Sequence, residues 1–238
     1  MQQQAIEYVD NGQRHIHQLF VDEFHPGPRP GILVFPEAYG LADHTLQRAQ
    51  RLAALGYAAL AVDLHGDGRE FKDLAQVRPA IVALFSDRPA WRARLRTAFD
   101  LLLAQPQVDG TRTGAIGFCF GGACCLELAR SGAPLSAIVT FHAGLQAPLE
   151  ADAGQIKAKV LICHGAEDPL LKPEALATVL AELTRDKVDW QLLSHGNVVH
   201  SFTNPEADAR GTPGFAYNAN ADHRSWAAMQ GLFAEVFA

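Results

Sequence analysis

Three residues of this chain, Cys119, Asp168 and His200, have the types and the order that nucleophilic catalysis requires. Cys119 stands in Gly117-x-Cys119-x-Gly121, which has the form of a nucleophile elbow with cysteine where serine is usual. The glycines matter because a turn that lifts one side chain clear of a sheet leaves no room for side chains two residues before and after it. A helix that starts after such a turn points its free N–H groups at the sulfur and favours the thiolate.

The candidate acid and the candidate base each follow a later apolar run. Asp168 comes after residues 160–163, and His200 comes after residues 188–193. Nucleophile, acid and histidine thus follow one another in the order found in α/β-hydrolases. In that arrangement the histidine acts as base and acid, while the carboxylate orients its ring. The order therefore predicts a Cys-His-Asp triad.

Each of these assignments has an alternative in the same sequence. Cys119 could be a buried core cysteine, and Asp168 could simply start a turn or cap the next helix. Glu167 competes as the acid, and His195 lies close enough before His200 to compete as the base. A single histidine is more often a surface or core residue than a catalytic one. The prediction depends on the joint placement of all three groups.

The elements that must position these groups alternate between strands and helices. Runs that are apolar throughout predict buried strands at 32–35, 57–62, 114–118, 137–141, 160–163 and 188–193. Helical spacing of apolar residues predicts helices after Asp43, after Pro89, from Ala123, at 174–184 and at 222–237. This pattern predicts one α/β domain over 1–238 with a doubly wound, mostly parallel sheet and helices on both faces. Such sheets carry their sites beyond the C-terminal ends of the strands.

Two further segments are less regular. Asn11-Gly12 between 6–8 and 14–20 predicts an antiparallel hairpin, on which we expect His15 and His17 to be exposed. Residues 70–87 show weaker periodicity, which indicates a connecting or lid-like excursion.

Composition excludes several classes of protein. The 238 residues carry a net charge of -6 and no Lys/Arg cluster, so we expect no nucleic-acid partner. The N-terminus lacks the features of a signal peptide, and no apolar run could span a membrane. The four cysteines form no metal-binding pattern, and the adjacent Cys124 and Cys125 are expected in the core. We therefore expect a cytoplasmic protein, monomeric or homodimeric, with a small-molecule partner and neither metal nor organic cofactor.

Four segments together resemble the dienelactone hydrolase family, and the resemblance runs from about residue 30 to the C-terminus. They are Gly117-Phe118-Cys119-Phe120-Gly121-Gly122, His164-Gly165-x-x-Asp168-Pro169, His200-Ser201-Phe202 and Pro36-Glu37-Ala38-Tyr39-Gly40. The resemblance implies an α/β-hydrolase fold. It favours His200 over His195 and Asp168 over Glu167.

The resemblance also implies roles that the residues alone do not indicate. Glu37 would hold the resting thiol and govern its ionisation, because a carboxylate beside a thiol disfavours the thiolate. The alternative for Glu37 is a solvated position in a loop. The backbone N–H groups of Ala38 and Phe120 would form the oxyanion hole.

On the substrate side the chain departs from the family. Members hold a substrate carboxylate with arginines, and one of these follows the histidine by four residues, where this chain has Asn204. Arg78 could supply the other, although Arg69 competes with it. Tyr39 and Ser201 complete the candidate substrate contacts. Because a missing bidentate arginine removes a strong contact, a dienelactone carboxylate is a less expected substrate.

The triad order and the resemblance together predict a hydrolase of lactones or activated carboxylic esters that works through an acyl-thioester on Cys119. One alternative is a broad carboxylesterase or thioesterase. Another is a non-catalytic protein of α/β-hydrolase fold that binds a small molecule. A redox sensor is a further reading of Cys119, but no resolving cysteine is evident.

Overall fold

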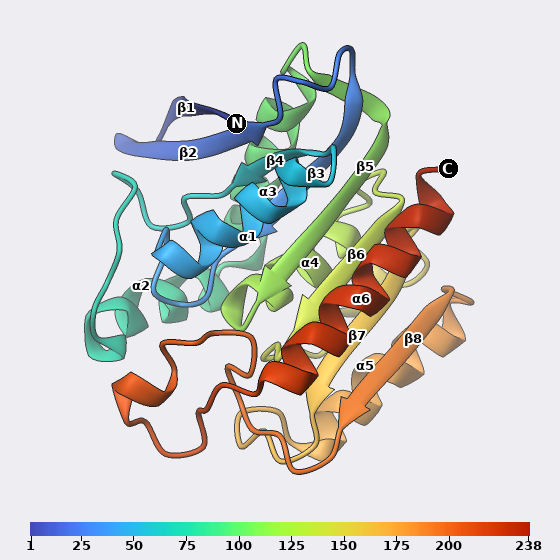
Figure 1. The fold of residues 1–238 in the computed structure, drawn as a ribbon. Coiled ribbons are helices and arrows are strands. Elements are labelled where there is room, and N and C mark those ends of the chain that lie inside the picture. Colours follow the sequence, from blue (N-terminus) through green and yellow to red (C-terminus); the bar gives the residue numbers. More distant parts are fainter. The chain divides into compact units, whose positions relative to one another are not determined.

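The chain folds into two compact units, Met1–Ala115 and Ile116–Ala238 (Figure 1). A computed structural model describes residues 1–238. The first unit holds β1 (Gln2–Asp10), β2 (Gln13–Val21), β3 (Arg29–Phe35), α1 (Asp43–Ala54), β4 (Ala58–Ala61), α2 (Leu74–Ser86) and α3 (Arg88–Leu103). Strand β5 (Val108–Phe118) begins in the first unit and ends in the second. The second unit continues with α4 (Phe120–Arg130), β6 (Ala137–Phe141), η1 (Glu150–Asp152), β7 (Lys159–Gly165), α5 (Pro173–Arg185), β8 (Trp190–His195), η2 (Asp208–Arg210) and α6 (Ala219–Val236).

The eight strands are hydrogen-bonded in the order β1-β2-β4-β3-β5-β6-β7-β8. The pairs β1–β2 and β2–β4 are antiparallel, whereas β3–β4, β6–β7 and β7–β8 are parallel. Within the second unit, α6 lies on one face of the strands and α4 and α5 lie on the other (Figure 1). The predicted α/β fold, with a mostly parallel sheet and an antiparallel N-terminal pair, is therefore confirmed. The prediction of a single domain over 1–238 stays a prediction.

The opening hairpin has the predicted turn, but the predicted exposure of its two histidines is wrong. Asn11 and Gly12 both have positive φ, and Asp10 pairs with Gln13, as a two-residue turn requires. The expectation that His15 and His17 are exposed was wrong, because both are fully buried.

The loop around Asp63 explains the burial of the two histidines. Nδ1 of His15 donates to the carbonyl of Asp63 at 3.0 Å, and the N–H of Asp63 donates to Nδ1 of His17 at 2.9 Å. The ring of Tyr8 stacks on His15 with centroids 4.8 Å apart. Burial lowers the pKa of His17 to about 4, so its ring is neutral at pH 7.

The segment expected to be a connecting or lid-like excursion contains the helix α2. Asp73 caps this helix by accepting from the N–H of Ala75 at 2.8 Å. Only Val77 and Leu84 are buried, and Pro79 interrupts the helix interior. A helix with so few buried residues shows little periodicity in its sequence, which explains the weak signal.

The second unit contains a strand and a helix that are buried along their whole length. Every residue of β6 and of α4 is buried, so α4 is covered on all sides. Cys124 and Cys125 are fully buried free cysteines, as expected, and burial raises the pKa of the Cys125 thiol well above its ordinary value. None of the helices is both long enough and apolar enough to cross a lipid bilayer.

Candidate active site

Cys119 occupies the turn between β5 and α4. Its backbone has φ 53° and ψ -115°, a strained conformation for a residue with a side chain. Its N–H donates to the carbonyl of Phe141 at 3.0 Å. A Cβ on Gly117 would lie 2.0 Å from the carbonyl oxygen of Gly121, so only glycine fits there. The turn expected of the Gly-x-Cys-x-Gly motif is therefore present, and α4 starts at the residue after the cysteine.

His200 and Asp168 form a buried pair in the same unit. Nδ1 of His200 donates to Oδ2 of Asp168 at 2.7 Å, and neither side chain has exposed surface. The other oxygen, Oδ1, accepts from the N–H of Leu170 at 2.8 Å. Asp168 thus starts a turn with one oxygen and orients the histidine with the other. We call Cys119, Asp168 and His200 the Cys119 group.

The electrostatics of His200 depend on Cys119. Burial alone lowers the pKa of His200, but the electrostatic influence of Cys119 and the contact with Asp168 raise it to about 10. Nε2 of His200 is buried and has no hydrogen bond of ordinary geometry. A thiolate beside an imidazolium is the form in which a cysteine is nucleophilic.

The competing residues occupy other positions. Glu167 is exposed, and its backbone N–H donates to the carbonyl of Val198. Nε2 of His195 shares a hydrogen bond of 2.9 Å with the hydroxyl of Ser225. Burial, and then the charge of Arg224, lower the pKa of His195. The structure thus pairs an acid with His200 and a hydroxyl with His195.

Ser201 and Asn204 lie in the loop that carries His200. Ser201 has φ 58° and is buried. Asn204 is 0% exposed, and its Oδ1 accepts from the N–H of Glu206 at 3.0 Å. Asn204 is therefore buried and organises the loop in this structure.

Three of the predicted site residues follow β3 in the first unit. Glu37, Ala38 and Tyr39 are all buried. The carbonyl of Ala38 accepts from Nε2 of His65 at 2.9 Å, and that of Tyr39 accepts from the N–H of Phe71 at 2.8 Å. The segment is thus held by two loops of its own unit.

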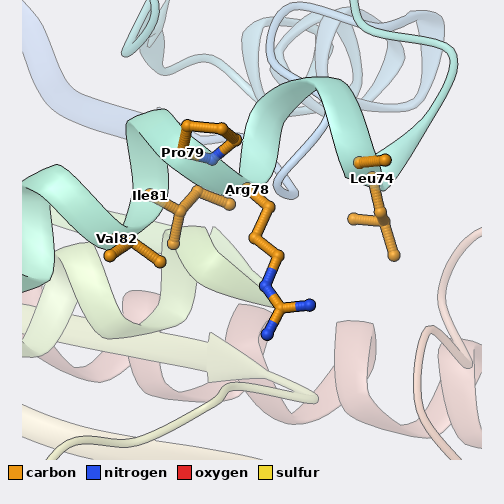
Figure 2. Close-up of a pocket in the computed structure, with 6 residues that line it drawn as sticks. Leu74, Arg78, Pro79, Ile81 and Val82 are labelled. Atoms are coloured by element: carbon orange, nitrogen blue, oxygen red, sulfur yellow. The ribbon is translucent and has the colours of Figure 1, made fainter.

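Arg78 lies on the exposed side of α2. It lines a hollow that is otherwise apolar, formed by Leu74, Ala75, Pro79, Ile81 and Val82 (Figure 2). Its guanidinium extends away from the helix axis (Figure 2). A carboxylate could approach Arg78 from this hollow, and its walls would suit an apolar body.

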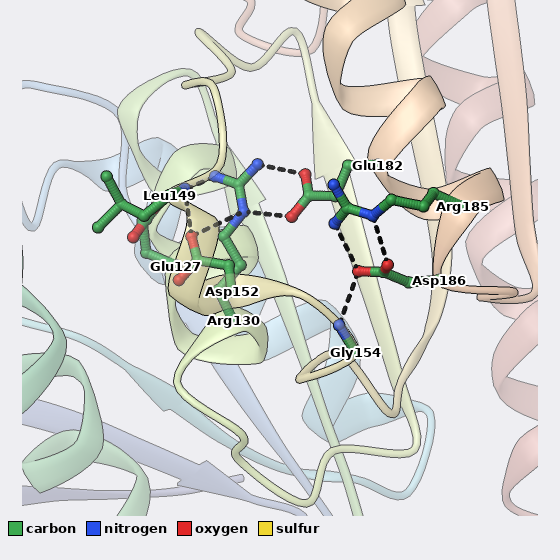
Figure 3. Close-up of polar contacts among 8 residues, drawn as sticks. All are labelled: Glu127, Arg130, Leu149, Asp152, Gly154, Glu182, Arg185 and Asp186. Carbon is green, nitrogen blue, oxygen red and sulfur yellow. Dashed lines mark hydrogen bonds and ion pairs between the residues drawn. The ribbon is translucent and has the colours of Figure 1, made fainter.

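The far end of α4 is anchored by a buried ion cluster that the sequence reasoning missed. Nη1 of Arg130 lies 2.7 Å from Glu127, and Nε lies 2.9 Å from Glu182 and 3.9 Å from Asp152 (Figure 3). Nη2 pairs with the second oxygen of Glu182. We call these four residues the Arg130 cluster. It ties the helix that starts at the elbow to α5 and η1.

A second residue that the sequence reasoning missed is His142, directly after β6. It is fully buried and packs edge-on against His200, with ring centroids 5.1 Å apart. The rule that sites lie beyond the C-terminal ends of strands could have drawn attention to it. Nowhere do three or more His, Cys, Asp or Glu side chains gather so that they could hold a metal ion.

Comparison with known proteins identifies the family. The sequence model of the dienelactone hydrolase family matches residues 18–237. The chain belongs to the dienelactone hydrolase family. This family membership makes the protein a hydrolytic enzyme of the ester and lactone class, as predicted.

Individual relatives agree with this assignment. The chain is similar to a dienelactone hydrolase-like promiscuous phosphotriesterase from metagenomic libraries, with 54% identity, a TM-score of 0.97 and coverage of 100% of this chain and 99% of the other. It is 33% identical over 150 residues to an uncharacterized protein of Caenorhabditis elegans, covering 62% of this chain and 94% of that protein. It is also 25% identical over 223 residues to a Yersinia pestis protein provisionally named carboxymethylenebutenolidase, covering 89% and 80%.

Proposed function

We propose that this dienelactone hydrolase family member cleaves lactones or activated esters with Cys119 as nucleophile, His200 as acid and base, and Asp168 as the group that orients His200. The observation that carries the proposal is the buried His200–Asp168 hydrogen bond of 2.7 Å, together with the influence of Cys119 on the same imidazole. An imidazole linked to an acid on one side and to a thiolate on the other is equipped for proton transfer during acyl transfer.

The proposed reaction has two halves. In the first, the Cys119 sulfur bonds to the carbonyl carbon, the C–O bond breaks, and the leaving oxygen takes the Nε2 proton of His200. In the second, Nε2 takes a proton from water, the hydroxide adds to the acyl-thioester, and the C–S bond breaks. The acid is released and the thiolate returns. A lactone leaves its alcohol on the same molecule, so one product results.

Two backbone donors are proposed for the oxyanion. Phe120 is the first residue of α4, where the helix dipole favours negative charge. The N–H of Ala38 and the carboxylate of Glu37 keep the roles that the family resemblance implies. Each oxyanion donor typically lowers the barrier by about 3 to 4 kcal/mol. Tyr39, Arg78, Ser201 and Asn204 stay predictions as substrate contacts, as do the cytoplasmic location and the monomeric or homodimeric state.

Substitution of the nucleophile tests this proposal directly. Cys119→Ala should abolish hydrolysis of 4-nitrophenyl esters, and intact-mass analysis should show an acyl adduct on the wild-type protein only. Cys124→Ala, which changes a buried cysteine five residues further along the chain, should keep the wild-type rate. Full activity in Cys119→Ala would refute the proposal. Comparison of lactones with linear esters then separates a lactonase from a broad esterase or thioesterase.

A second candidate activity is hydrolysis of phosphotriesters. Its support is the 54% identity to a protein described as a promiscuous phosphotriesterase. We propose that the Cys119 sulfur bonds to phosphorus, that an aryloxide leaves, and that water then releases the phosphodiester. Diethyl 4-nitrophenyl phosphate is the probe, and release of 4-nitrophenol must disappear in Cys119→Ala. A rate no higher than that of buffer would reject this activity alone.

A further inference from the structure

We propose that His142 is a positioning residue, which fixes the ring of His200 and the loop that carries it. The inference rests on the function proposed above. We assign His142 no contact with the substrate or with the sulfur. It acts only through His200.

The backbone of His142 is strained at a place where the surroundings hold it. It has φ 40°, in the left-handed region that a residue with a side chain rarely adopts. Its N–H donates to the carbonyl of Cys163 at 2.9 Å, which keeps the residue in line with β6 and β7. Such strain is retained mainly at functional sites, where neighbouring contacts over-determine the conformation. The strain therefore marks His142 as a candidate functional residue.

The side chain of His142 contacts three of the four residues 200–203. Its ring lies edge-on to His200, with centroids 5.1 Å apart and planes at 69°, and edge-on to Phe202, at 5.1 Å and 81°. Nε2 of His142 and the hydroxyl of Thr203 share a hydrogen bond of 2.7 Å. His142 and Thr203 are both 0% exposed. One buried ring thus contacts the loop at residues 200, 202 and 203.

The bond from Asp168 to Nδ1 does not by itself fix the His200 ring. A single hydrogen bond leaves rotation about its axis free, and the χ2 torsion of histidine has broad minima. The plane of the ring must be set by packing. His142 and Phe215, whose ring centroid lies 4.7 Å from that of His200, are the two aromatic neighbours that supply it. Because Nε2 carries the proton that is transferred, a small rotation of the ring changes its distance to the reacting atoms.

The test uses two substitutions that remove the same hydrogen bond from opposite ends. His142→Phe keeps a ring against His200 but loses the bond, and Thr203→Val loses the bond but keeps the histidine. Each should lower kcat for a 4-nitrophenyl ester about 10- to 100-fold and leave KM within about threefold. The double variant should lose little beyond either single one, because both act through one bond.

Two buried residues of the same unit serve as matched controls. Thr140→Val removes a buried hydroxyl of β6 that has no hydrogen bond, and it should leave kcat unchanged. His195→Phe removes a histidine that also bonds a hydroxyl and packs edge-on against Phe202, at 5.5 Å. It does not stack on His200, so it should not change the pH profile.

The pH profile separates a positioning role from a merely structural one. The titratable groups that interact with His200 are Cys119, Asp168, His164 and His142 itself, of which Thr203→Val removes none. If His142 aligns the ring, the apparent pKa values in the profile of kcat/KM shift in both His142→Phe and Thr203→Val. If both variants keep the wild-type kcat and profile, the inference is overturned and the proposed hydrolysis stands.

Alkylation of Cys119 by iodoacetamide gives a readout that does not need hydrolysis. Its pH dependence reports how well the imidazole supports the thiolate, and it should shift in His142→Phe and Thr203→Val but not in Thr140→Val. An unchanged alkylation profile in His142→Phe and Thr203→Val would overturn the inference. This outcome does not depend on whether Cys119→Ala supports the proposed hydrolysis. If His142→Phe unfolds, Thr203→Val decides alone, because it keeps the volume of the side chain.

Discussion

Two buried charged groups of the second unit differ in how completely their hydrogen bonds are satisfied. In the Arg130 cluster, Nε, Nη1 and Nη2 of the guanidinium each face a carboxylate oxygen (Figure 3). In the Cys119 group, Nδ1 of His200 is bonded, whereas Nε2 is buried without an ordinary hydrogen bond. Cys119 also has a strained backbone, while Arg130 lies in a regular helix. A satisfied buried network holds a structure rigid, and an incomplete one keeps a group ready to react.

The difference predicts that damage to one group lowers activity and damage to the other lowers stability. The substitutions below test that separation.

Asp168→Asn should have the largest effect on activity. An amide that donates to Nδ1 would hold the His200 ring in the wrong tautomer, so kcat/KM for an activated ester should fall about 10³- to 10⁴-fold. The unfolding midpoint in urea should change much less than in an Arg130 variant. Glu167→Gln, at the exposed acid next in the chain, is the control and should be close to wild type. Equal losses in the two variants would contradict the assigned acid.

Arg130→Met should have the largest effect on stability. It leaves three buried carboxylates without their cation, so the free energy of unfolding should fall by about 3 to 5 kcal/mol. The rate per folded molecule, counted by titration of Cys119 with an alkylating agent, should stay within about twofold of wild type. A loss of activity that exceeds the loss of folded protein would mean that the cluster also shapes the elbow.

The pH dependence of stability sharpens the contrast. Because the folded protein raises the pKa of His200 to about 10, this group adds stability that is complete below about pH 6.5 and is lost as pH rises towards 10. Each unit of that shift corresponds to about 1.4 kcal/mol, so the loss should exceed about 1 kcal/mol. Unfolding in urea at pH 6.5 and pH 10 measures it. Cys119→Ala lacks the thiolate, so its stability should fall less over this range, and an equal fall would show that the sulfur does not interact with His200.

Arg185→Ala should have the smallest effect. Arg185 pairs with Asp186 beside the Arg130 cluster, but its side chain is 54% exposed and water can replace the contact (Figure 3). Asp186 keeps its bond from the N–H of Gly154 at 2.8 Å. The urea midpoint should therefore shift far less than in Arg130→Met, and added salt should reduce the shift further. A shift as large as that of Arg130→Met would mean that exposure does not separate the two pairs.

Features that depend on local sterics and on the periodicity of apolar residues were predictable from the sequence. Gly117 and Gly121 predicted the turn at Cys119, because a side chain at Gly117 would clash with the backbone of Gly121. Asn11-Gly12 announced the hairpin because a two-residue turn requires positive φ at both positions. Runs that are apolar throughout announced the buried parallel strands. The order of Cys119, Asp168 and His200 then followed from the order of those strands.

Which polar residues are buried, and which groups they face, became clear from the three-dimensional structure and not from the sequence. The sequence predicted that His15 and His17 are exposed. In the structure both are buried and bond the backbone of Asp63, which lies far along the chain. Arg130 bonds Glu182, which is 52 residues away in the sequence, and His142 bonds Thr203, which is 61 residues away. Residue types alone did not distinguish His195 from His200 as the candidate base. In the structure His200 bonds the carboxylate of Asp168, whereas His195 bonds the hydroxyl of Ser225. The physical reason is that the free energy of a buried polar group depends on partners distant in sequence, whereas a tight turn depends only on its neighbours.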